Sequence, residues 1–234
     1  MSSPLFDLKT FGDIEKATFI ERPNRFKAIC EKDGKVVSCH VADPGRLKEI
    51  FIPGRKVLVA KHPPGMKTEY KLLAINVDDE WVLLNTSIHS KIGEEAIKRG
   101  VLGFRPKKIK REVRFGSSRI DYLLDDKIFV ELKGTNLLME GCCLFPDAPT
   151  ERGARHLREL KEAIKQGYES YILFMGLRNC KCFKTHHKLD PNFSAEFKDA
   201  LQKGVKFKGF KIFLDDNNLT VHLGEELVLC DDGV

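Results

Sequence analysis

The sequence has no long apolar run and no internal repeat. No uninterrupted apolar stretch approaches the ~20 residues that span a bilayer, and residues 1–16 carry acids without the apolar core of a signal peptide. We therefore expect a cytoplasmic protein that does not enter a membrane. Its 234 residues, 42% hydrophobic and 32% charged, are typical of a globular protein with one large domain or two ordinary ones.

A cysteine framework is also lacking. The seven cysteines are odd in number, and only Cys142-Cys143 and Cys180-Lys-Cys182 are closely spaced. This spacing predicts neither a set of disulfides nor a CxxC zinc pair. We expect reduced and mostly buried thiols.

Positive charge is concentrated in one segment. Of the net charge of +6, residues 88–115 contribute nine basic and three acidic side chains. The stretch Arg105–Arg114, with Lys107, Lys108 and Lys110, holds six basic residues and one acid. Such a stretch can follow a phosphate backbone if it forms an exposed edge. A solvated edge strand that its charges protect from aggregation fits as well, and the sequence leaves both readings open.

Residues 1–87 are expected to form one domain. From residue 19 onward, five short apolar-polar runs are separated by turn residues such as Asp33-Gly34 and Pro53-Gly54. The five runs are Phe26–Cys30, Val36–Val41, Lys56–Ala60, Tyr70–Val77 and Trp81–Leu84. Their number and spacing predict a small OB-like β-barrel, a fold that often binds single strands or oligonucleotides.

Residues 88–234 show a different pattern and are expected to form a second, α/β domain. The predicted order is helix, three strands, helix, strand, helix and a final strand pair, which describes a sheet covered by helices. The expected elements are a helix around Ile92–Gly100, strands near 109–115, 118–124 and 127–133, a helix from Thr150 to Gln166, a strand at 170–175, a helix at 192–203 and strands around 205–223.

The most specific local feature is the hairpin predicted over residues 118–133. Its apolar rows are Ile120, Tyr122 and Leu124 in one strand and Ile128, Val130 and Leu132 in the other. If these rows share a face, Asp121, Glu131 and Lys133 share the opposite face. A three-residue loop that pairs Leu124 with Ile128 puts Asp121 opposite Glu131, whereas a two-residue loop would move Asp121 to the other face.

Two carboxylates ~5 Å apart at Cβ, with a lysine beside them, predict a site for a divalent cation. Uncompensated, the pair is costly, and Mg²⁺ or Mn²⁺ prefers such oxygen ligands. Lys133 would then orient a water or meet charge on a phosphate. A solvated hairpin with a weak ion pair between Lys133 and an acid also fits. Glu112 in the preceding strand is either another carboxylate of the site or a partner for Arg114 or Arg119.

Several motifs together resemble the sugar fermentation stimulation protein A family. The resemblance spans roughly residues 19–223, in order and without a missing block. The motifs are Arg22-Pro-Asn-Arg-Phe26, His40-Val-Ala-Asp-Pro-Gly-Arg-Leu47, Gly116-Ser-Ser-Arg-Ile-Asp-Tyr122, Val130-Glu-Leu-Lys133, Phe145-Pro-Asp-Ala-Pro-Thr-Glu-Arg-Gly-Ala-Arg-His-Leu157 and Asp190-Pro-Asn-Phe193.

This resemblance implies an N-terminal OB-like domain followed by a PD-(D/E)XK nuclease-like α/β domain that binds DNA. Carried over by motif, Asp121, Glu131 and Lys133 are the nuclease triad, with Asp121 and Glu131 as metal ligands. The family name refers to regulation of sugar metabolism, whereas the motif refers to cleavage. A metal-dependent nuclease, a non-catalytic DNA-binding regulator and a nucleic-acid-binding module of a larger complex therefore all remain open.

A second candidate site is the start of the helix that Thr150 caps. Arg152 and His156 are four residues apart on one helix face, and a helix N-terminus beside them favours a phosphate. Alternatively, Arg152 pairs with a neighbouring glutamate and the segment only caps the helix. The complete predicted nucleic-acid-binding set is Arg25, Arg46, Lys107, Lys108, Lys110, Arg119, Arg152 and His156.

Overall fold

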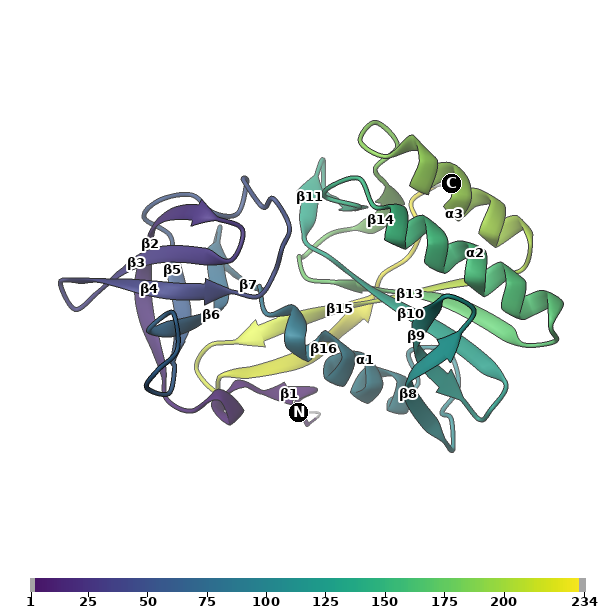
Figure 1. The fold of residues 1–234 in the computed structure, drawn as a ribbon, viewed down its shortest axis with the longest axis horizontal. Coiled ribbons are helices and arrows are strands. Elements are labelled where there is room, and N and C mark those ends of the chain that lie inside the picture. The colour runs from purple at the N-terminus through teal and green to yellow at the C-terminus, as the bar shows by residue number, and fades with distance from the viewer. Residues whose placement is uncertain (1–2, 232–234) are drawn as a thin grey trace. The chain divides into compact units, whose positions relative to one another are not determined.

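The computed structural model describes residues 3–231, which form two compact units (Figure 1). One unit holds the chain up to His89 together with Phe213–Leu223, and the other holds Ser90–Ile212 and the chain from Gly224 onward. Among these residues, no helix is both long and apolar enough to cross a bilayer. The boundary between two independent domains, placed between residues 87 and 88, stays a prediction.

The first unit is built on a closed five-stranded barrel, which confirms the expected OB-like fold. The strands β2 to β6 pair antiparallel in the order β4-β3-β2-β5-β6, and a parallel pairing of β4 with β6 closes the barrel. This is the strand order of the OB-fold. The elements of this unit are β1 (Phe6–Asp7), η1 (Leu8–Phe11), β2 (Ile14–Asn24), β3 (Lys27–Lys32), β4 (Lys35–Val41), β5 (Lys56–Lys61), β6 (Tyr70–Val77), β7 (Glu80–Leu83) and η2 (Thr86–Ile88).

The count of five strands was right, but one member was wrong. The sequence analysis missed β2, the first barrel strand, in which charged residues outnumber buried ones. It also included β7, which pairs only with β6 outside the barrel. The Asp33-Gly34 turn between β3 and β4 has positive φ at both residues, 49° and 74°, as a tight two-residue hairpin turn requires.

The second unit contains an α/β arrangement, as expected. Its sheet has the strand order β16-β15-β13-β10-β9-β8, with β13 parallel to β10 and to β15. The elements are α1 (His89–Lys98), β8 (Ile109–Phe115), β9 (Ser118–Leu124), β10 (Ile128–Thr135), β11 (Leu137–Met139), β12 (Cys142–Phe145), α2 (Glu151–Lys165), β13 (Glu169–Gly176), β14 (Cys182–Thr185), α3 (Pro191–Gln202), β15 (Lys206–Asp215) and β16 (Thr220–Glu226).

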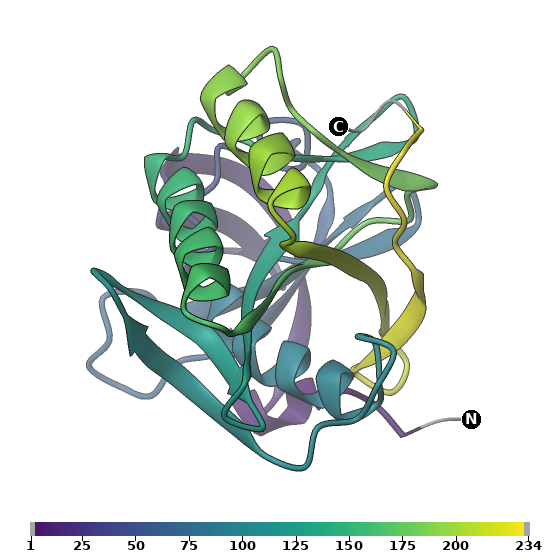
Figure 2. The same cartoon turned by 90° about the vertical axis from the view of Figure 1, so that its right-hand side faces the viewer.

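Helices cover both faces of this sheet (Figures 1 and 2). The helices α2 and α3 lie side by side on one face, over a core that includes Phe129, Phe174 and Leu157. On the other face, α1 approaches so closely that a Cβ on Gly93 would lie 2.6 Å from atoms of Leu132 and Tyr122. The carboxylate hairpin β9-β10 is therefore held between two helical layers.

One buried aspartate joins the starts of both covering helices. The side chain of Asp190 accepts a hydrogen bond from Phe193 N at 2.9 Å and so caps α3. Its second oxygen accepts from Thr150 N at 2.8 Å, while the Thr150 side chain caps α2 by accepting from Gly153 N. The predicted cap at Thr150 is confirmed, and the link to Asp190 explains how α2 is fixed at its N-terminal end.

The cysteine prediction was wrong. Cys143 is bonded to Cys180 and Cys182 to Cys230, and only Cys30, Cys39 and Cys142 are free. The two bonded pairs are 37 and 48 residues apart in the sequence, so no local cysteine spacing predicts them. Of these four cysteines, Cys143 and Cys182 lie on β12 and β14 of a three-stranded sheet of order β11-β12-β14, which the sequence analysis did not predict.

Candidate active site and nucleic-acid interface

The register of the β9-β10 hairpin agrees with the prediction. Leu124 pairs with Ile128 across a loop in which Asp125 and Asp126 have φ of 49° and 57°. The backbone ladder runs only as far as the pair Tyr122 and Val130. Asp121 and Glu131 would form the next pair, so the two carboxylates stand where the strands separate.

The strand β9 is irregular at Asp121. Ile120 belongs to the core under α2 and α3, whereas the Tyr122 hydroxyl donates to Ser90 O at 2.6 Å on the α1 side. The predicted apolar row of Ile120, Tyr122 and Leu124 is therefore wrong, because it is split between two faces. The ladder with β8 is also interrupted here, and the opposing residue, Glu112, has φ of 52°.

The hydrogen bonds of Asp121 follow from this irregularity. Its Oδ2 atom accepts from Leu132 N at 2.7 Å, and its own N lies 3.4 Å from Glu131 Oε2. Burial, followed by the nearby negative charge of Glu131, raises the pKa of Asp121 to about 7. Without a compensating cation, this carboxylate is therefore only partly ionised near neutral pH.

Glu131 has a different environment. Its side chain is 2% exposed, and Oε1 lies 2.5 Å from Lys133 Nζ and in contact with His156 Nδ1. Lys133 Nζ also lies 3.1 Å from that histidine nitrogen. Burial alone would raise the pKa of Glu131, but the charge of Lys133 and the hydrogen bond with His156 hold that pKa below its ordinary value.

Each carboxylate keeps one oxygen for a ligand. Glu131 Oε1 is bound by Lys133 and His156, and Asp121 Oδ2 is bound by Leu132 N. Within residues 3–231, Asp121 Oδ1 has no hydrogen bond, and Glu131 Oε2 has only the long contact with Asp121 N. Two adjacent carboxylate oxygens are suitable ligands for a hard divalent cation.

The basic stretch Arg105–Arg114, which leads into β8, is partly engaged in ion pairs. β8 is the edge strand of its sheet, and Lys108 and Lys110 both pair with Asp126, at 2.8 and 2.6 Å. Lys107 makes no ion pair among the described residues, although its backbone N donates to Asp125. Of the two readings left open by the sequence, the ion pairs fit the solvated edge strand.

The two predicted residues of α2 lie in unlike surroundings. Arg152 is exposed and forms no ion pair in the described part of the chain, because Glu151 pairs with Arg158 instead. His156 is buried, 2% exposed, against Glu131. His156 therefore belongs to the carboxylate cluster, and Arg152 does not join it. Arg119, also predicted, is exposed and lies opposite Arg114 in the β8-β9 ladder.

The barrel brings Arg25 and Arg46 together at a cavity of about 490 Å³, which Lys48 also lines. Arg22 organises this region, since its guanidinium donates to the carbonyls of four residues and lies 4.4 Å from the centre of the Phe51 ring. Those four residues are Arg25, Asp43, Gly45 and Arg46.

A second barrel cavity, of about 800 Å³, adjoins the first, because Asn24 lines both. It lies between the β2-β3 and β5-β6 connections, the loops with which OB-folds bind oligonucleotides. Phe26, 56% exposed, lines it. The other side chains with aromatic, charged or thioether groups are Lys27, His40, His62, Met66, Lys67 and Lys71.

The sequence analysis did not identify the residues of this second cavity. A signal was present, because Phe26 ends the motif that begins at Arg22, and His40 begins the motif that contains Arg46. From these motifs, only Arg25 and Arg46 were predicted to bind nucleic acid. In space, both lead to the same face of the barrel.

Comparisons with known proteins agree with this architecture. Residues 20–84 match the family described as "SfsA N-terminal OB domain", and residues 87–218 match "Sugar fermentation stimulation protein RE domain". A homologue of this name from Sulfolobus acidocaldarius is 42% identical, with 97% of this chain and 93% of the relative covered. One from Methanothermobacter thermautotrophicus is also 42% identical, with 86% and 87% covered.

A solved structure is similar over nearly the whole chain. It is the Pyrococcus furiosus SfsA protein in complex with Ca²⁺, with a TM-score of 0.85 and 29% sequence identity. The similarity covers 98% of this chain and 100% of that one.

Proposed function

The chain belongs to the sugar fermentation stimulation protein family, and we propose that it binds nucleic acid and hydrolyses phosphodiester bonds at a divalent-metal site. One observation carries the proposal. Asp121 and Glu131 present adjacent carboxylates at the point where β9 and β10 separate, with Lys133 beside them. This is the arrangement of ligands and cation that phosphodiester hydrolysis requires.

The two carboxylates fit a hard divalent cation. Asp121 has a raised pKa because it is buried beside the charge of Glu131, and a bound cation would remove that cost. Mg²⁺ or Mn²⁺ is the proposed cofactor, and the related Pyrococcus furiosus protein was solved in complex with Ca²⁺, which also prefers oxygen ligands. Such a cation would polarise a phosphate and activate a water for attack.

Lys133 and His156 act on the same carboxylate. Lys133, 14% exposed, is positioned by Glu131 and has an ammonium group that can meet the negative charge developing on a phosphate. His156, buried on α2, fixes the orientation of Glu131 through Oε1 and leaves Oε2 directed toward Asp121. We assign Lys133 to the chemistry and His156 to positioning.

The barrel would supply affinity, and single strands are the form it fits. Exposed Phe26 offers a surface on which a base can stack, and such stacking does not depend on base identity. Besides Arg22, six cations line the two cavities, and they make no ion pair among the described residues, so they are available to phosphates. They are Arg25, Arg46 and Lys48 at the first cavity and Lys27, Lys67 and Lys71 at the second.

A non-catalytic DNA-binding regulator is the second candidate, and one observation favours it. Glu131 is already neutralised by Lys133 and His156, so the buried charge is stable without a metal. In that case, the nuclease fold would be retained only as a binding scaffold.

The deciding experiment is incubation of pure protein with labelled single- and double-stranded DNA and RNA, with Mg²⁺, Mn²⁺ or EDTA. We expect cleavage only with a divalent cation, none by Asp121→Asn, and wild-type cleavage by Asp126→Asn. Asp126 is a matched control because it lies in the same hairpin but at the surface, 48% exposed. Binding without cleavage under every condition would support the regulator instead.

A further inference from the structure

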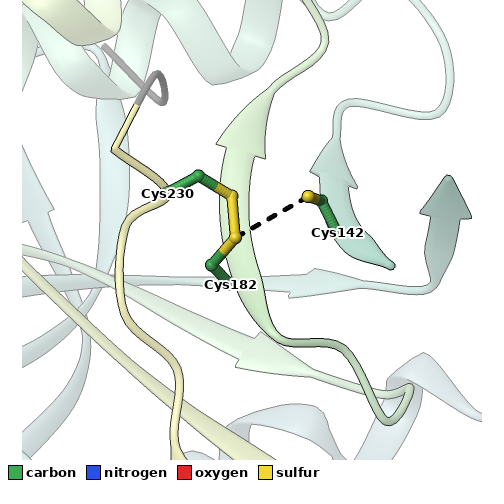
Figure 3. Close-up of side chains that lie close together, drawn as sticks. All are labelled: Cys142, Cys182 and Cys230. Carbon is green, nitrogen blue, oxygen red and sulfur yellow. Dashed lines mark hydrogen bonds between the residues drawn. A yellow bond between two sulfur atoms is a disulfide. The ribbon is translucent and has the colours of Figure 1, made fainter. Parts of the chain in front are cut away.

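Three sulfur atoms that the proposed function does not use meet at the small β11-β12-β14 sheet. Cys142 on β12, Cys182 on β14 and Cys230 near the C-terminus have sulfurs that all lie within 4.8 Å of one another (Figure 3). Cys182 and Cys230 form a disulfide, and the free Cys142 sulfur lies 3.6 Å from that of Cys182. A disulfide needs only two of these residues, so the third requires another explanation.

We propose that, once its disulfide is reduced, this cluster binds one soft divalent metal ion such as Zn²⁺ through three thiolates. The inference does not rest on the proposed function. It concerns ligands of the opposite kind, because thiolates select soft metals whereas the Asp121 and Glu131 oxygens select hard ones.

The distances fit such an ion. Four sulfurs at the Zn–S distance of about 2.3 Å in a tetrahedron are about 3.8 Å apart, close to the 3.6 Å between the sulfurs of Cys142 and Cys182. Figure 3 shows the Cys142 sulfur beside the disulfide, not on the extension of its bond. The three sulfurs therefore form a triangle, which suits a metal ion better than attack of a thiol along a disulfide bond.

The backbone holds the three cysteines in place independently of the disulfide. Cys142 and Cys182 are partners in the parallel β12-β14 ladder. On the other side of β14, Cys230 N donates to Phe183 O at 2.8 Å, and Phe183 N donates to Val228 O at 2.8 Å. Reduction would thus leave three thiols on three hydrogen-bonded segments, and the spacing needed for metal binding requires little movement.

The chemistry is balanced with a dithiol as the reductant. The dithiol gives two electrons and two protons to the bond between Cys182 and Cys230, which yields two thiols and the oxidised reductant. A divalent ion then displaces one proton from each of the three thiols as three metal–sulfur bonds form. Within residues 3–231 the cluster has three members, and because Cys142 and Cys182 are partly exposed, a solvent molecule can take the fourth position.

Cobalt titration tests this proposal in the full-length protein carrying Asp121→Asn, which removes the oxygen site. Protein reduced with a dithiol and freed of it without air should bind one Co²⁺ with the intense thiolate charge-transfer and tetrahedral ligand-field bands. Zn²⁺ should then bleach both bands. The oxidised protein should show neither band.

Two variants identify the ligands. Cys142→Ser should weaken cobalt binding by more than about tenfold, because it removes one ligand of three at a partly exposed position that folding does not require. Cys39→Ala, which removes a free thiol of the barrel, should leave both bands unchanged. The proposal is overturned if reduced protein gives no charge-transfer band, if Cys142→Ser keeps it, or if Cys39→Ala loses it.

Discussion

The carboxylate site of the second unit and the basic face of the barrel differ in burial, in the sign of their charged groups and in how these groups are paired. The site around Asp121 and Glu131 is buried and acidic, and each carboxylate is held by hydrogen bonds. The barrel face is exposed, and its cations other than Arg22 make no ion pair in the described part of the chain. Under the proposed function, affinity and chemistry lie in separate regions, so we expect that each can be removed alone.

The largest effect is expected from Lys133→Ala, which tests whether chemistry and affinity can be changed separately. If Lys133 meets charge in the transition state, its loss should lower kcat by roughly 10²- to 10³-fold and leave nucleic-acid affinity unchanged. Single-turnover cleavage and a binding titration measure the two effects. Lys127→Ala, exposed in the same hairpin, is the control. A fall in affinity equal to the fall in rate would show that Lys133 only binds.

The pH dependence of stability tests the acidic region alone. The folded-state pKa of Asp121 is about 7, above its ordinary value of 3.8, so the folded state binds more protons than the unfolded state between about pH 4 and 7. The free energy of unfolding of the metal-free protein should therefore decrease as pH rises through that window, by a few kcal/mol at most.

Urea denaturation at several pH values measures this slope. Asp121→Asn should remove it, and saturating Mn²⁺ should flatten it, because the cation compensates the ionised carboxylate. A slope that survives in Asp121→Asn would assign the effect to another group.

Phe26→Ala tests the barrel face. Loss of one stacked base costs about 1–3 kcal/mol, so single-strand affinity should fall roughly tenfold or more while cleavage of bound substrate continues. Fluorescence anisotropy with a short labelled oligonucleotide measures the change. Phe213→Ala is a fair control, since Phe213 is 54% exposed and lies outside both cavities. Equal losses of affinity in the two variants would show that any exposed aromatic ring contributes non-specifically to binding.

The smallest effect is expected from the β8 edge. Changing Lys67 and Lys71 to glutamine should flatten the dependence of log affinity on log salt by about 0.7 per lost contact with a single strand. Changing Lys108 and Lys110 to glutamine should alter that slope less, because both already pair with Asp126. If the changes at Lys108 and Lys110 flattened the slope more than those at Lys67 and Lys71, the basic stretch at β8 would be the main contact with nucleic acid, as the sequence alone allowed.

Local patterns predicted most of the fold. The Leu124 to Ile128 register follows from a turn and an alternation that lie within a few residues, and the Thr150 cap follows from one side chain. The first barrel strand β2 was missed because few of its residues are buried. The barrel was still predicted, since β3 and β4 alternate clearly and turn residues separate the later strands.

The site was less predictable because its decisive contacts join distant residues. Nothing near Asp121 in the sequence indicates that the alternation of β9 breaks there, or that Leu132 N donates to its carboxylate. His156 looked like a phosphate ligand on a helix, but the packing of α2 turns it onto Glu131. The disulfides likewise join distant residues, and no motif predicts the small sheet on which Cys143 and Cys182 lie.

The central claim is that Asp121 and Glu131 together hold a hard divalent cation. Crystals of the protein grown with Mn²⁺ and a single-stranded oligonucleotide would test it most directly by anomalous diffraction. We predict a peak about 2.0–2.6 Å from one oxygen of each carboxylate, Asp121 Oδ1 and Glu131 Oε2, that disappears in Asp121→Asn. If no such peak appears at saturating Mn²⁺ with the oligonucleotide bound, the metal-dependent site is contradicted, and the regulator takes its place.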